Sequence, residues 1–146
     1  MRVEDILRSK NHRIVMIRMN ETVETAARLM KAENIGALVV KDVCRTEGNT
    51  VVGMFTERDI ARSLLEHGAR VLQMPISSLM SRNLTTCAPT DSLAHVLGLM
   101  EDKHIRHVPV LDGDTLVGLV GVRDFIGIRR AEIAAEEKAG TPELTH

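Results

Sequence analysis

The residues best suited to binding chemistry are two aspartates, each of which follows an apolar run that contains a glycine. Segment 53–59 reads GMFTERD and places Thr56 and Asp59 three positions apart, where a helix is expected to start. Segment 118–124 repeats this pattern 65 positions later, with Asp124 kept and Gly121 in place of the hydroxyl. A carboxylate at a helix start, beside a strand glycine, is suited to accept hydrogen bonds from two vicinal hydroxyls of a ribose.

A capping box is the alternative interpretation of Thr56 and Asp59. In such a box the two side chains satisfy each other's backbone amides and nothing binds. Gly121 has no hydroxyl for a reciprocal box, so reciprocal capping does not explain Asp124. The second copy therefore favours a binding role.

Segment 103–109, KHIRHVP, is a second candidate for binding chemistry. The guanidinium of Arg106 and the imidazole of His107 suit an anionic phosphate, although a solvated loop is the alternative. We expect no metal on His104 and His107, because no third ligand is evident and Arg106 adds positive charge. The first copy has NIGA at 34–37, so the two sites cannot be chemically equal.

These candidates lie in an internal repeat that predicts the elements around them. Residues 20–40 recur 70 positions later, and each copy is expected to form strand, helix, strand, strand and helix. The prediction is an α+β fold of two pseudo-twofold-related repeats that form one compact module. We place the first repeat at 1–73, the second at 74–131, and a helix extension with a frayed tail at 132–146.

The repeat also predicts where individual elements begin and end. Asn20 and Thr90 are expected to cap the first helix of each copy. We expect extra strands at 14–17 and 84–87, and echoing segments at 3–7 and 76–80. Three further expectations are a long turn over 41–50, a tight turn at Asp112-Gly113, and a helix end at 140–142.

Composition excludes several classes of function. A formal charge of -1 and a pI near 6.6 give no electrostatic footprint for nucleic acid. The apolar runs are too short to span a membrane and the first residues do not resemble a signal peptide, so we expect a cytoplasmic protein. Cys44 and Cys87 cannot form a zinc site by themselves and are expected to be reduced, with a disulfide left open. The aromatic residues are Phe55 and Phe125, so a base would meet aliphatic walls.

The repeated pattern resembles a tandem cystathionine-beta-synthase (CBS) domain pair, also called a Bateman module. The resemblance rests on segments 35–40 and 53–59 in the first copy and on 105–110 and 116–124 in the second, and it covers nearly the whole chain. It implies a regulatory fold that binds adenosine-containing ligands (AMP, ADP, ATP, NAD or S-adenosylmethionine) in clefts between the repeats. It also implies a homodimer formed through helices, with no membrane and no nucleic-acid partner.

The resemblance assigns roles residue by residue. Thr56 and Asp59 correspond to the ribose-binding pair, and Asp124 alone corresponds in the second copy. Arg106 and His107 correspond to the phosphate-binding pair, and Gly36-Ala37 to a base pocket of backbone groups and apolar walls. The full set of expected ligand-binding residues is Ile35, Gly36, Ala37, Thr56, Arg58, Asp59, Thr86, Arg106, His107, Pro109, Arg123 and Asp124.

Three functions compete at this point. A regulatory adenosyl-binding module, which acts on a protein that the sequence does not name, is the leading hypothesis. A dimerisation module without ligand binding is the alternative. We expect no enzyme, because the sequence has no nucleophile elbow, P-loop or metal-ligand constellation.

Overall fold

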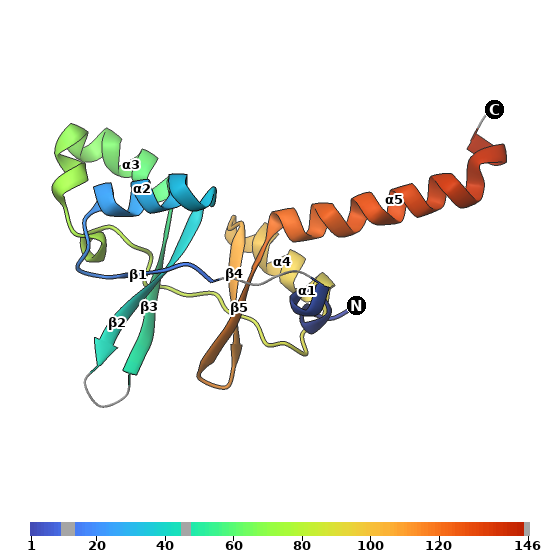
Figure 1. The fold of residues 1–146 in the computed structure, drawn as a ribbon, viewed down its shortest axis with the longest axis horizontal. Helices are drawn as coiled ribbons and strands as arrows, with labels where there is room; N and C mark the ends of the chain where they lie inside the picture. Colours follow the sequence, from blue (N-terminus) through green and yellow to red (C-terminus); the bar gives the residue numbers. More distant parts are fainter. Residues whose placement is uncertain (10–13, 45–47, 145–146) are drawn as a thin grey trace. The chain divides into compact units, whose positions relative to one another are not determined.

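The computed structural model describes residues 1–9, 14–44 and 48–144, with side chains described outside 43–49 and 141–144 (Figure 1). The chain divides into two compact units. We call Arg13–Thr86 the N-repeat unit, and Met1–His12 together with Cys87–His146 the C-repeat unit.

The N-repeat unit contains a three-stranded sheet in the order β1-β2-β3. Strand β1 runs parallel to β2, and β2 forms an antiparallel hairpin with β3 that pairs Ala37 with Thr56. A stretch of 3-10 turns follows the last helix of this unit. The elements are β1 (Met16–Arg18), α2 (Val23–Glu33), β2 (Ala37–Cys44), β3 (Gly48–Thr56), α3 (Glu57–His67), η1 (Gly68–Gln73) and η2 (Ile76–Ser78).

The C-repeat unit contains the antiparallel hairpin β4-β5, in which His107 pairs with Gly121. The extra strand expected at 84–87 is reduced to one parallel bridge between Cys87 and Val110, so that prediction was wrong for the second copy. Its counterpart in the first copy, β1, is a strand of three residues. The elements of the unit are α1 (Val3–Ser9), α4 (Leu93–Lys103), β4 (His107–Asp112), β5 (Thr115–Gly121) and α5 (Val122–Leu144).

The short segments that echo each other, 3–7 and 76–80, pack into opposite cores. Val3 and Ile6 of α1 are buried with Val96 and Val120 in the C-repeat unit. Ile76 is fully buried in the core of the N-repeat unit. Each segment therefore packs with the other sequence repeat, and the compact units do not follow the repeat boundaries along the chain.

The first helix of each copy is capped two residues later than the sequence pattern predicts. Thr22 Oγ1 accepts from the Thr25 N–H at 3.2 Å, and Ser92 Oγ accepts from the His95 N–H at 3.1 Å. Asn20 and Thr90 lie in the turns that precede these caps. The caps still obey the 70-residue repeat, so the repeat was correct and the cap position was wrong.

Three further sequence predictions concern two turns and the end of the last helix. The tight turn is confirmed, since Gly113 has φ 61° between the paired residues Asp112 and Thr115. The prediction of a long turn over 41–50 was wrong, because strand β2 extends to Cys44 and strand β3 begins at Gly48. The centre of the predicted turn, 45–47, lies outside the described residues. The prediction of a helix end at 140–142 was also wrong, since α5 continues to Leu144. A glycine weakens a helix by about 1 kcal/mol without terminating it, so Gly140 does not end α5.

Candidate functional site

The junction of β3 and α3 holds Thr56 and Asp59 in a complete capping box. The Thr56 N–H donates to Asp59 Oδ2 at 2.9 Å, and the Thr56 hydroxyl donates to the same oxygen at 3.1 Å. The Asp59 N–H donates back to Thr56 Oγ1 at 3.3 Å. The alternative interpretation of this motif is therefore present in the structure, and any ligand has to bind a pair that already caps a helix.

The second copy keeps half of this arrangement. The Gly121 N–H donates to Asp124 Oδ2 at 2.8 Å, across the junction of β5 and α5. Asp124 thus caps its helix without needing a hydroxyl partner. A carboxylate can satisfy the N-cap amide by itself, so the missing hydroxyl of Gly121 does not by itself favour a binding role for Asp124.

One carboxylate oxygen carries all the capping bonds that the structure describes for Asp59. Each of them ends on Oδ2, and the side chain is half-buried. A carboxylate offers two oxygens and about four lone-pair positions. Capping and ligand binding are therefore compatible at Asp59, because Oδ1 takes no part in the described capping bonds.

Hairpin pairing brings the start of one strand to the start of the following helix in both units. The Glu57 N–H donates to the Gly36 carbonyl at 3.1 Å, and the Val122 N–H donates to the Arg106 carbonyl at 3.0 Å. Gly36 and Arg106 are thus structural equivalents. Within each unit, the hairpin therefore places Gly36-Ala37 beside Thr56, and Arg106-His107 beside Gly121.

Glu57 is a site neighbour that the sequence interpretation left out. A Cβ added to Gly36 would lie 3.4 Å from Glu57 Cδ and 3.4 Å from one carboxylate oxygen, so this side chain covers the glycine. Val122 stands at the equivalent place in the second copy. The N-repeat junction therefore carries Glu57 with Asp59, whereas the C-repeat junction carries Arg106 and His107 with Asp124. The position of Glu57, first in a helix that pairs back to a strand start, was the available signal.

Five other residues were expected to bind the ligand. Pro109 is buried in β4, and its carbonyl accepts from the Cys87 N–H at 3.0 Å. Thr86 is the half-buried last residue of the N-repeat unit. Ile35 packs partly against the core of that unit, and the exposed residues Arg58 and Arg123 are each the second residue of their helix.

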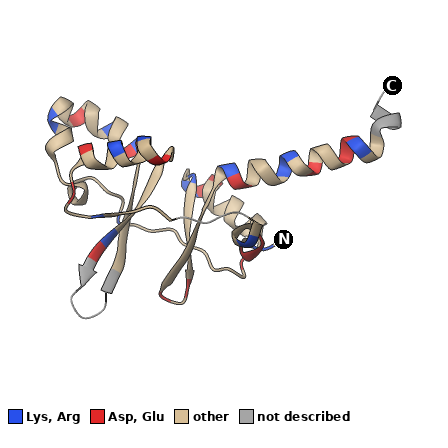
Figure 2. Ribbon diagram, viewed as in Figure 1, with Lys and Arg blue, Asp and Glu red and all other residues tan. Residues whose placement is uncertain are grey.

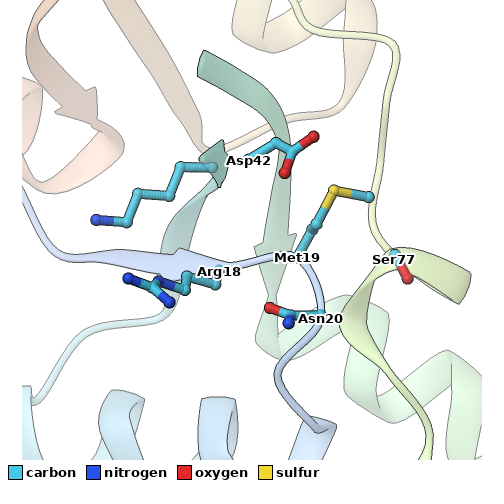
Figure 3. A pocket seen from close by; sticks show the side chains of 6 residues that line it. Arg18, Met19, Asn20, Asp42 and Ser77 are labelled. Atoms are coloured by element: carbon cyan, nitrogen blue, oxygen red, sulfur yellow. The ribbon is translucent and has the colours of Figure 1, made fainter. Parts of the chain in front are cut away.

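A polar hollow lies elsewhere in the N-repeat unit (Figure 3). Its volume is about 350 Å³, and it opens where the link from β1 to α2 meets β2 and η2. Lys41, one of its residues, lies four positions beyond Ala37 along β2, so the hollow does not include the candidate site. The lining residues are Arg18, Met19, Asn20, Lys41, Asp42 and Ser77.

Cys87 is a free buried thiol beside β4. Burial, with a smaller contribution from the charge of Asp91, raises the pKa of Cys87 to about 11. The thiol is therefore protonated and unreactive near neutral pH. Cys44 lies among the residues whose side chains the structure does not describe.

The described part of the chain contains neither a metal-ligand cluster nor a membrane-spanning helix. Within residues 1–9, 14–44 and 48–144, no three His, Cys, Asp or Glu side chains are grouped to hold a metal ion. Over the same residues, no helix combines the length and the apolar character needed to cross a bilayer.

Two α+β units built from one sequence repeat define a tandem-repeat module, and comparison with known families identifies the repeat. The CBS domain pattern matches residues 3–66 and 76–130. The chain belongs to the CBS domain family, as the resemblance indicated, and pairs of these domains are in general regulatory ligand-binding modules.

Similar proteins include other CBS-domain proteins. The CBS domain-containing protein YhcV of Bacillus subtilis is 37% identical over 112 residues, which cover 77% of this chain and 76% of YhcV. The mitochondrial protein CBSX3 of Arabidopsis thaliana is 28% identical over 130 residues, covering 85% of this chain and 62% of that protein.

Solved structures of the family have the same fold. The CBS-domain protein ATU1752 of Agrobacterium tumefaciens superimposes with a TM-score of 0.82 at 31% identity, over 88% of this chain and 92% of that one. The CBS domain pair of MJ0100 superimposes with a TM-score of 0.76 at 26% identity, over 90% of this chain and 98% of that one. The MJ0100 pair was solved in complex with 5'-methylthioadenosine and S-adenosyl-L-methionine.

Proposed function

We propose that this protein is a regulatory module that binds an adenosine-containing ligand, from the group AMP, ADP, ATP, NAD and S-adenosylmethionine. One observation carries the proposal: both units hold a helix-start carboxylate next to the first residues of a strand, through the bonds from Glu57 to Gly36 and from Val122 to Arg106. The complex of the MJ0100 pair with two adenosyl compounds supports the ligand class. We propose no catalytic role, and the cytoplasm is the compartment that the sequence favours.

We assign roles to the residues at these two junctions. Asp59 with Thr56, and Asp124 in the second unit, accept from ribose hydroxyls. Arg106 and His107 bind phosphate oxygens through charge-assisted hydrogen bonds. Because Glu57 adds a negative charge beside Gly36, the N-repeat junction suits the sugar and base better than a phosphate.

Ligand-dependent stabilisation tests this proposal. A ligand at a hundredfold its dissociation constant stabilises the native state by about 2.7 kcal/mol, which moves the thermal midpoint by several degrees. We expect a shift with at least one of AMP, ATP, NAD and S-adenosylmethionine. The shift should disappear in the double variant Asp59→Asn with Asp124→Asn, measured by differential scanning fluorimetry and by calorimetric titration.

Asp91→Asn is the matched control for this double variant. Asp91 Oδ2 also accepts a backbone N–H from three residues earlier, that of Ala88 at 2.8 Å, but it lies outside the proposed site. The control should lose stability and keep the ligand shift. Equal ligand responses in the control and the double variant would refute the site.

A structural dimerisation module is the second candidate function. It is favoured by the hydrogen bonds that tie Asp59 and Asp124 to their own backbone. A chain that shows no shift with any of the four ligands, yet forms a homodimer, would establish this candidate instead. We propose the homodimer in both cases, since Leu65 on α3 is 90% exposed and Ile126 on α5 is 60% exposed.

A further inference from the structure

Beyond Ile128, residues 129–139 of α5 are exposed rather than packed against the core of their own unit. Val122, Phe125 and Ile128 pack against the core of the C-repeat unit, whereas every residue from 129 to 139 is exposed. Figure 1 shows the helix continuing beyond the rest of the unit. The family match ends at residue 130, so most of this extension is not part of the CBS domain. Helices in proteins depend largely on packing for their stability, so this extension requires a contact.

An apolar stripe follows the exposed side of α5. Ile126 and Ile133 are seven positions apart, and residues at this spacing lie on the same face of a helix. Their exposed fractions are 60% and 39%. Together with Arg129 and Arg130 they line a furrow of about 320 Å³, in which the arginine side chains contribute aliphatic stems.

Charges flank this stripe symmetrically. Arg129 and Arg130 lie four and three residues before Ile133, and Glu136 and Glu137 lie three and four residues after it. Figure 2 shows the positive and negative positions along α5. Arg129 Nη1 reaches Glu136 Oε1 at 3.3 Å, which shows that these two residues share one flank of the helix. The pair is exposed and contributes little to stability within one chain.

We propose that α5 pairs with α5 of a second copy in antiparallel orientation, with the twofold axis beside Ile133. Reversal about Ile133 brings Arg129 next to Glu136 of the partner subunit and Arg130 next to Glu137 of the partner subunit. Both flanks of the seam then carry opposite charges, whereas parallel pairing would align like charges. The same reversal places Ile126 opposite Gly140, where the missing side chain leaves room for it.

This inference specifies the seam of the homodimer included in the proposed function, and it does not depend on the ligand. Two charge-reversal variants test it: R129E with R130E, and E136R with E137R. Each variant puts like charges on both flanks of its own dimer. We expect each to raise the dimer dissociation constant at least about tenfold in sedimentation equilibrium, because four ion pairs of the symmetric seam are reversed.

Mixing the two variants is the decisive measurement. An equimolar mixture pairs an all-acidic stripe with an all-basic stripe, so heterodimers should form at least as tightly as the unmodified homodimer. This recovery would show that each double variant is folded. Lys138→Glu, a charge reversal on the opposite face of the helix, is the control and should leave the dissociation constant unchanged.

Three other outcomes would refute the proposed pairing of α5 with α5 of a second copy. Unchanged dimers in both double variants, a mixture that fails to associate, or an unmodified chain that stays monomeric would each refute it. Unchanged dimers would mean that the stripe serves another partner and that the homodimer forms elsewhere. Ligand-dependent thermal shifts, measured on the same variants, keep a failure of the seam distinct from a failure of the adenosyl site.

Discussion

Gly53 and Gly118 occupy equivalent places in the two repeats but face different neighbours, so the same substitution should have different costs. A Cβ at Gly53 would lie 2.6 Å from the Ser81 carbonyl oxygen and 3.0 Å from Met80 Sδ. The Ser81 carbonyl cannot easily move, because it accepts from the Met54 N–H at 3.0 Å. Overpacking of this kind costs about 1–3 kcal/mol. Replacing glycine also lowers the conformational entropy of the unfolded chain, which offsets up to about 1 kcal/mol of this cost.

Gly118→Ala is the matched control for Gly53→Ala. The added Cβ would lie 2.5 Å from Leu7 Cδ2, the end of a flexible side chain that can rotate away. We expect Gly53→Ala to lower the thermal midpoint by several degrees and Gly118→Ala to lower it clearly less, as measured by scanning calorimetry. A larger loss for Gly118→Ala than for Gly53→Ala would refute the reasoning that backbone contacts are the less forgiving.

Further predictions concern caps and the buried thiol. Ser92→Ala should cost about 1 kcal/mol in thermal unfolding through the lost bond to His95, whereas Thr90→Ala should cost less than half of that. Thr56→Val should cost about as much as Ser92→Ala, since it removes the hydroxyl from the capping box. Because the pKa of Cys87 is raised from 9.0 to about 11, the unfolded thiol ionises first, and stability should fall as pH rises from about 9 to about 11. Cys87→Ala should remove that part of the decline, and no difference from the unmodified chain would contradict it.

The repeat was readable from the sequence because related positions keep related chemistry. The spacing of 65 between the two GxxxxxD segments identified equivalent helix starts, and the structure places Asp59 and Asp124 in equivalent capping bonds. The same repeat could not locate the caps at Thr22 and Ser92. Two candidate residues lay within three positions of each other in each copy, and local pattern does not decide which of them ends the preceding turn.

The capping bonds show what a sequence pattern leaves undecided about a binding site. A hydroxyl and a carboxylate three residues apart are compatible with a capping box and with a ribose site. The sequence could not rank them, because which oxygen of Asp59 bonds to the backbone depends on side-chain geometry. The structure shows the box in place and leaves Oδ1 outside the described capping bonds.

The sequence by itself determined the duplication, the α+β class and the chemical difference between Gly36-Ala37 and Arg106-His107, since each follows from residue types at fixed spacings. Tertiary structure decided which segments share a core. Val3 and Ile6 pack with the second repeat, and Ile76 packs with the first. Burial of apolar side chains is non-directional, so the sequence of a short amphipathic segment does not determine which of two apolar cores the segment joins. The core that each short segment joins is decided by the path of the chain in space.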